Sequence, residues 1–245
     1  MNKIMMAAVA ATGIFAAGAA ESGQGPANGW RLSVGGLARG SMKAQVGDLA
    51  AKRCEAYGAD FDVQYRAFSS GDFSLWTGVG GTYVPKQKMG SSSFYECDAS
   101  DPTITVEDGG KGRLEAAMGE FRILLVPEYA LTERWMVGAR IGAAFDWVRG
   151  TVDSSVWSRT DIHVPGLPST VIPVGPFREN DHFTEFVTQA VLGLQTTYLL
   201  TDSVGLYANV DYRCGGNATF EKGGERYAEL NLDGWCVGAG VVLAF

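Results

Sequence analysis

Side chains that could carry acid–base chemistry are scarce in this chain, which contains two histidines. His182 follows Asp181 in "ENDHF", where the two could form an acid–base pair, and His163 stands in "DIHVPG". A catalytic histidine needs a nucleophile or a second acid within hydrogen-bond reach. Outer-membrane deacylases have a His-x-Ser pattern, and neither histidine here is followed by a serine two positions further on. We therefore interpret both histidines as polar loop residues. A role as an enzyme acting on lipid or peptide is therefore less favoured than a structural role or an ion channel, both considered below. No cofactor is expected.

Charged residues at every second position are a larger signal than the histidines. In "ADFDVQYRA" at 59–67, Asp60, Asp62 and Arg66 alternate with Phe61 and Val63. A period of two places the two sets on opposite faces of a β-strand. Similar runs recur along the chain, and their predicted inward face carries Arg31, Arg39, Asp60, Asp62, Arg66, Glu120, Arg122, Arg140, Asp146, Asp211 and Arg213. We interpret this set as a salt-bridge network that fills a barrel, and the alternative is a narrow ion path gated by the same pairs.

Eight strands must position these side chains. We expect them at 29–42, 59–67, 73–84, 113–130, 135–148, 183–200, 204–214 and 234–245. Short turns ("SSGD", "TER", "TDS") alternate with long loops such as 85–112 and 149–182. In an antiparallel meander, the short turns then share one end and the long loops the other, as in bacterial outer-membrane barrels. The predicted fold is an all-β, transmembrane, antiparallel up-and-down barrel of eight strands, or ten if 149–182 adds a hairpin.

Alternation alone does not decide which face is inside, because a soluble sandwich or a lipocalin-like barrel would expose the charged face. Aromatic residues favour the membrane case, since they gather at the two ends of the apolar face as interface anchors do. The short-turn end has Trp30, Phe73, Trp135, Tyr198 and Phe245, and the long-loop end has Tyr83, Trp147, Phe186 and Tyr212.

The N-terminus indicates export. Lys3 precedes an apolar run from Ile4 to Phe15, and small residues follow in "AGAAES". This is the pattern of a secretory signal peptide, predicted for residues 1–20, which leaves 21–245 as the barrel domain. The formal charge of −7 argues against a nucleic-acid partner.

The C-terminal "GWCVGAGVVLAF" resembles the closing signature of bacterial outer-membrane proteins. Val241, Leu243 and Phe245 carry the resemblance, which implies recognition by the barrel-assembly machinery. The chain as a whole resembles the small eight-stranded family that includes the OmpA transmembrane domain, OmpX and opacity-type surface proteins. The resemblance rests on architecture and implies a monomer in the lipid of the outer membrane, with periplasmic termini and extracellular loops.

Four cysteines allow three connectivities in an exported chain. Cys54 and Cys97 fall in two loops at the outer end, and Cys214 and Cys236 lie at similar heights on adjoining strands. We predict the disulfides Cys54–Cys97 and Cys214–Cys236. Alternation places Cys214 outward and Cys236 inward, so the second pair requires a bulge near Gly215. No close Cys/His spacing suggests a metal site.

The favoured function is structural, with surface interaction through long extracellular loops. The segment 149–182 contains many apolar residues for a loop, which fits self-packing, an extra hairpin, or a surface for a host, phage or protein ligand. A small porin or narrow ion channel is the alternative.

Overall fold

The computed structural model describes residues 29–46, 52–101, 103–222 and 225–245. The predicted signal peptide lies outside these residues. Ten strands follow one another along the chain: β1 (Trp30–Val46), β2 (Lys52–Ser70), β3 (Phe73–Asp101), β4 (Ile104–Ala130), β5 (Trp135–Ile162), β6 (Thr170–Leu199), β7 (Val204–Cys214), β8 (Asn217–Lys222), β9 (Glu225–Asn231) and β10 (Gly234–Ala244). In the described part of the chain, no helix is long and apolar enough to cross a membrane.

Eight of these strands close into a ring. The order runs β10-β7-β6-β5-β4-β3-β2-β1, and β10 pairs with β1 to complete it. The closing ladder is antiparallel and unbroken from Arg31 opposite Ala244 to Gly40 opposite Trp235. Two backbone hydrogen bonds between Trp30 and Phe245 tie the first strand to the last residue. The prediction of an eight-stranded up-and-down barrel is confirmed.

The barrel is apolar outside and charged inside. Outward side chains such as Leu192, Leu194 and Val34 are more than half exposed, whereas Arg122 and Asp62 are 1% exposed. This distribution is the reverse of a soluble barrel, which buries its apolar face. The face assignment that alternation left open is therefore that of a membrane-spanning barrel.

A bulge in β1 changes which residues point inward. The register with β2 shifts between Arg39 and Met42, and Ser41 at the bulge has a φ of 65°. One extra residue reverses the alternation, so Arg39 and Met42 both face the interior. Met42 is completely buried, although uninterrupted alternation would have placed it outside. The bulge therefore brings an apolar stretch into the barrel.

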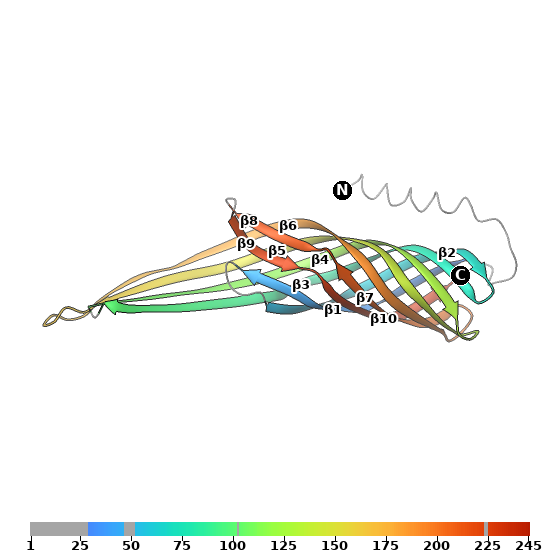
Figure 1. Ribbon diagram of the computed structural model, residues 1–245, viewed down its shortest axis with the longest axis horizontal. Helices are drawn as coiled ribbons and strands as arrows, with labels where there is room; N and C mark the ends of the chain where they lie inside the picture. The colour runs from blue at the N-terminus through green and yellow to red at the C-terminus, as the bar shows by residue number, and fades with distance from the viewer. Residues whose placement is uncertain (1–28, 47–51, 102, 223–224) are drawn as a thin grey trace.

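Four strands project far beyond the ring. We predicted long loops at 85–112 and 149–182, with an extra hairpin as an alternative for 149–182. The loop prediction was wrong, because most of these residues extend β3, β4, β5 and β6, and the hairpin alternative for 149–182 is confirmed. The ladder of β3 with β4 reaches Asp101 and Ile104, and that of β5 with β6 reaches Ile162 and Thr170. Figure 1 shows these four strands tapering to the left of the ring. We call residues 90–112 and 153–180 the projecting sheet.

The segment 215–226, predicted as a loop, also contains strand. β8 and β9 form a hairpin, and β9 pairs with the upper part of β1 from Lys43 to Val46. In Figure 1 this hairpin lies at the end of the ring from which the projecting sheet emerges. It adds two strands to the sheet without entering the ring of eight.

Closure at β1 and β10 gives a direct test. Gly35 and Gly240 face each other, and a Cβ at Gly240 would overlap the carbonyl oxygen of Val34. We expect Gly240→Val to lower the free energy of unfolding by about 1–3 kcal/mol, the usual cost of overpacking. Urea unfolding in lipid vesicles measures this. Gly40→Val is the matched control, because a Cβ there meets no atom within 4 Å; an equal loss in both variants would contradict the role of the close approach.

Candidate functional site

The lower interior, nearer the short turns, is organised around buried arginines. Arg122 on β4 pairs with Asp60 and Asp62 on β2, each at 2.7 Å, and with Glu120 at 3.0 Å. Its guanidinium also donates a hydrogen bond to the hydroxyl of Thr82 at 3.0 Å. Three carboxylates around one guanidinium satisfy a charge that would otherwise be costly to bury.

Two more arginines extend this arrangement toward the short turns. Arg140 pairs with Asp62 at 3.1 Å and with Asp211 at 2.9 Å. Arg31 pairs with Glu128 at 2.8 Å, and its guanidinium lies 4.1 Å from the ring centre of Trp76. A cation over an indole ring is attracted by the negative ring face.

Arg39 and Arg213 lie toward the opposite end of the interior. Arg39 pairs with Asp146 at 3.1 Å and donates a hydrogen bond to the backbone oxygen of Leu232 at 2.8 Å. Arg213 forms an ion pair with Glu120. Five buried arginines thus face six buried carboxylates, and we call this set the charged layer: Arg31, Arg39, Arg122, Arg140, Arg213, Asp60, Asp62, Asp146, Asp211, Glu120 and Glu128.

The charged layer contains ten of the eleven predicted lumen residues. The eleventh, Arg66, is half-buried at the short-turn end, with its guanidinium 5.5 Å from the ring centre of Trp76. Sequence reasoning left out Glu128 and Trp76. Both share the parity of inward residues on their strands, and this alternation is the signal that identifies them, although the predicted set did not include them.

An apolar layer fills the other half of the interior. Its members come from six ring strands and from the β8–β9 hairpin, and those below 1% exposure are Met42, Ala56, Leu114, Ala116, Val148, Val152, Phe220, Leu230 and Leu232. Phe220 on the hairpin stacks on Phe183 of β6, with ring centres 4.8 Å apart. The hairpin therefore inserts its apolar face into the mouth of the barrel.

The two layers leave little space where they meet. A cavity there, lined by Leu37, Arg39, Met118, Asp146 and Cys236 among others, measures about 10 Å³. A space of roughly 10–15 Å³ holds about one water molecule. The interior at this level resembles a packed protein core more than an aqueous channel.

The four cysteines are free, so neither predicted disulfide is present. Cys54 is buried in the apolar layer, whereas Cys97 is exposed on the projecting sheet. Cys236 is buried opposite Asp211, and Cys214 is exposed beyond Arg213 on the other face of β7. The predicted bulge near Gly215 is absent from the ladder of β7 with β10, which is regular from Val204 to Arg213. Opposite faces keep these two thiols apart.

The histidines lie apart from the charged layer. His182 and Asp181 are successive strand residues and point to opposite faces, and the Nδ1 of His182 lies 3.2 Å from the hydroxyl of Thr151. His163 has a serine neighbour that we did not predict: the hydroxyl of Ser169 lies 2.5 Å from its Nδ1. Among the described residues, no group of three or more His, Cys, Asp or Glu side chains could hold a metal ion.

The outward face has aromatic residues at two levels. All nine predicted anchors are exposed, from Phe186 at 77% to Trp30 at 38%. Trp30 contacts Tyr65 at the short-turn end, and Tyr212 contacts Trp235 at the other, with ring centres 5.0 Å apart in each pair. Aromatic rings at two levels of an apolar wall suit the two interfaces of a bilayer.

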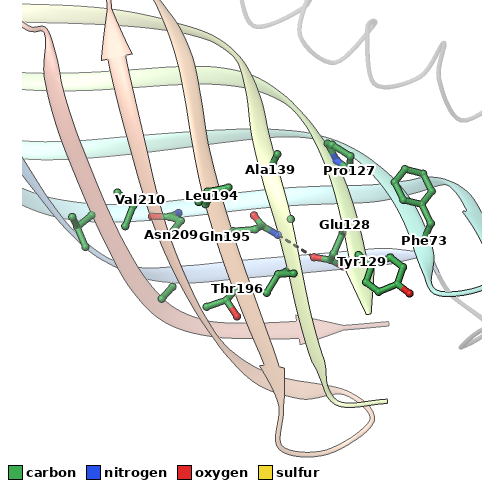
Figure 2. A pocket seen from close by; sticks show the side chains of 14 residues that line it. Phe73, Pro127, Glu128, Tyr129, Ala139, Leu194, Gln195, Thr196, Asn209 and Val210 are labelled. Atoms are coloured by element: carbon green, nitrogen blue, oxygen red, sulfur yellow. Dashed lines mark hydrogen bonds between the residues drawn. The ribbon is translucent and has the colours of Figure 1, made fainter. Parts of the chain in front are cut away.

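A shallow groove crosses the outward face between these levels (Figure 2). Two adjacent cross-strand rows form it: Tyr129, Val137, Thr196 and Ala208 in one, and Ala139, Leu194, Val210 and Val237 in the other. Its volume is about 650 Å³, within the roughly 300–1,000 Å³ of ligand sites. Small side chains at Ala139, Thr196 and Ala208 make the hollow. Figure 2 shows Glu128 and Gln195 hydrogen-bonded beneath it.

The projecting sheet is polar near the ring and apolar further out. Next to the ring, a groove of about 740 Å³ is lined by Lys111, Arg113, Asp153 and Arg178 among others. Lys86 pairs with Glu115 at 3.1 Å. The hydrogen bond from Lys86, aided by the attraction of Arg113, holds the pKa of Glu115 below its usual range.

Further out, apolar side chains are exposed on both faces of this sheet. Phe94, Val156 and Phe177 follow one face, and they are 38%, 47% and 65% exposed. Tyr95 and Trp157 pack together on the other face, with ring centres 6.2 Å apart. Exposed apolar clusters of this kind mark binding surfaces more often than scattered single residues do.

No protein-family model and no curated protein matches this chain. Similar solved structures include OprG, an outer membrane protein of Pseudomonas aeruginosa (11% identity, 89% of this chain and 96% of that chain covered, TM-score 0.48). Another is Ail, the attachment invasion locus protein of Yersinia pestis (12% identity, 88% of this chain and 99% of that chain covered, TM-score 0.38). A third is the outer membrane protease OmpT of Escherichia coli (10% identity, 92% of this chain and 99% of that chain covered, TM-score 0.32). One of the three is a protease and another an attachment protein, so likeness at this level assigns no function.

The charged layer predicts a large effect for one buried cation. We expect Arg122→Met to reduce the free energy of unfolding by about 3–5 kcal/mol, because it leaves buried carboxylates without their shared partner. Urea titration of the protein in vesicles gives this value. The exposed Arg113 is the control, since Arg113→Met should change stability by no more than about 1 kcal/mol. Similar reductions in the free energy of unfolding for the two variants would show that the buried ion pairs do not stabilise the barrel more than an exposed pair does.

Proposed function

We propose that this chain is an outer-membrane protein of a diderm bacterium with a structural and surface-binding role. The apolar wall between two aromatic levels supports insertion into a bilayer. The termini and short turns would then be periplasmic, and the projecting sheet extracellular. Insertion would use the assembly machinery through Val241, Leu243 and Phe245, of which Val241 and Leu243 pair with β1. We expect a monomer that is not an enzyme and needs no cofactor.

The exposed apolar surface of the projecting sheet is the observation that carries the binding role. A four-stranded sheet with apolar side chains on both faces exceeds what closing the barrel requires. We infer that residues around Val156 and Phe177 contact a protein partner from outside the cell, such as a host or phage protein, by burying these side chains.

Photo-crosslinking in living cells tests this role. A photoreactive amino acid at Phe177 or Val156 should give discrete protein crosslinks, because both side chains are exposed on the projecting sheet. Leu192 is the control position: it is 63% exposed on the barrel wall and should crosslink to lipid. If the probes at Leu192 and Phe177 captured the same proteins, or if the probe at Phe177 captured none, the proposed partner at the projecting sheet would be refuted.

The narrow-channel alternative gives a second test. Because the charged layer and the apolar layer are both packed, we expect the purified protein to produce no ion conductance steps in a planar bilayer. A porin in the same bilayer serves as the positive control, and a preparation from cells lacking the chain as the negative one. Reproducible steps that are absent from the negative control would establish the channel and overturn the closed interior.

A further inference from the structure

We propose that the groove on the outward face holds one chain of a phospholipid whose headgroup carries a primary amine. This inference rests on the proposed membrane insertion. The occupant is a lipid of the periplasmic leaflet with one headgroup chemistry. The direction of the groove, its floor and the Asp72 carboxylate at its lower end support this assignment.

The groove rises from the short-turn end toward the middle of the wall. Tyr129 lies two residues before the turn at Leu131, whereas Val237 lies eight residues before the C-terminal Phe245. Six strands line the groove, from β3 with Phe73 through β4, β5, β6 and β7 to β10, so it is about 24 Å long at roughly 4.8 Å per strand pair. With strands tilted by about 45°, the groove spans about 17 Å along the bilayer normal, a little over half of the roughly 30 Å hydrocarbon core.

The floor suits an acyl chain. Ala139, Thr196 and Ala208 lie at its centre, and the hydroxyl of Thr196 is occupied, because it donates a hydrogen bond to the Met136 carbonyl and accepts one from the Trp135 indole. A groove with satisfied polar groups and small apolar side chains gains by burying hydrocarbon and offers a sugar or peptide little to bind.

The lower end of the groove is acidic. Tyr129 lines this end, and its hydroxyl donates a hydrogen bond to the Asp72 carboxylate at 3.4 Å. The Asp72 carboxylate repels an anionic headgroup such as phosphatidylglycerol. It attracts the ammonium of phosphatidylethanolamine, whose three N–H groups can donate hydrogen bonds to it.

The test is native mass spectrometry of the full chain extracted with mild detergent from vesicles. The vesicles contain equal parts of phosphatidylethanolamine, phosphatidylglycerol and phosphatidylcholine with identical acyl chains. We expect one retained lipid, with phosphatidylethanolamine favoured over phosphatidylglycerol by up to about fivefold, the scale of one exposed ion pair. Equal retention of the three lipids, or no retained lipid, would overturn the proposal.

Matched variants separate the chain from the headgroup. Ala139→Leu and Ala208→Leu fill the floor and should abolish retention. Ala143→Leu, on the same face of β5 but outside the groove, should not. Asp72→Asn should remove the preference for phosphatidylethanolamine. Asp202→Asn should leave it unchanged, because Asp202 lies in the turn after β6 and is not part of the groove lining. Retention that survives both floor variants, or a preference that survives Asp72→Asn, would overturn the corresponding half of the proposal.

Gel mobility of boiled and unboiled samples distinguishes this inference from the proposed function. A closed barrel stays folded in detergent until it is heated, because all its strands are paired. A protein that inserts and shifts on heating but shows no lipid preference refutes only the lipid site. A protein that neither enters vesicles nor shifts on heating refutes the membrane function itself.

Discussion

Closure of β1 on β10 is the constraint on which the rest of the structure depends. In hydrocarbon, every backbone N–H and C=O must find a partner, and a sheet satisfies this only by having no edge. The ten-residue ladder from Arg31 to Gly40 provides that closure. Glycines at Gly35 and Gly240 let the two backbones and the side chains behind them fit. Once the ring is closed, each strand has one face toward the wall and one toward a narrow interior.

In a narrow interior, a buried charged side chain is costly unless it pairs with one of opposite charge. Arg122 meets three carboxylates, and Arg140 links two acids from different strands. In the other half, the barrel avoids charge altogether: Leu114, Val148 and the hairpin residue Phe220 form a hydrophobic core. A hydrophobic core thus lies above an ion-pair layer, and packed side chains occupy both halves of the interior.

The projecting sheet changes what the molecule presents to its surroundings. Since β3 to β6 continue as one sheet past the aromatic level, the surface is a hydrogen-bonded extension of the barrel sheet instead of a set of loops (Figure 1). A paired sheet has less conformational entropy to lose on binding than flexible loops have. At the other end, the groove of Figure 2 gives the apolar wall a hollow that rises from the short-turn end toward the middle of the barrel.

The sequence by itself determined the strand pattern, the ring of eight and the inward charges, because a period of two and alternating turn lengths are local properties. It also indicated Glu128 and Trp76, because both share the parity of the inward residues on their strands, although our predicted set did not include them. Only the tertiary structure decided which charges paired, since Arg31 meets Glu128 across the barrel. The bulge at Ser41 was equally invisible: one inserted residue reverses alternation and buries Met42. The disulfide prediction was wrong because it used only the position of each cysteine along its strand. A disulfide also requires that the two side chains point to the same face of the sheet.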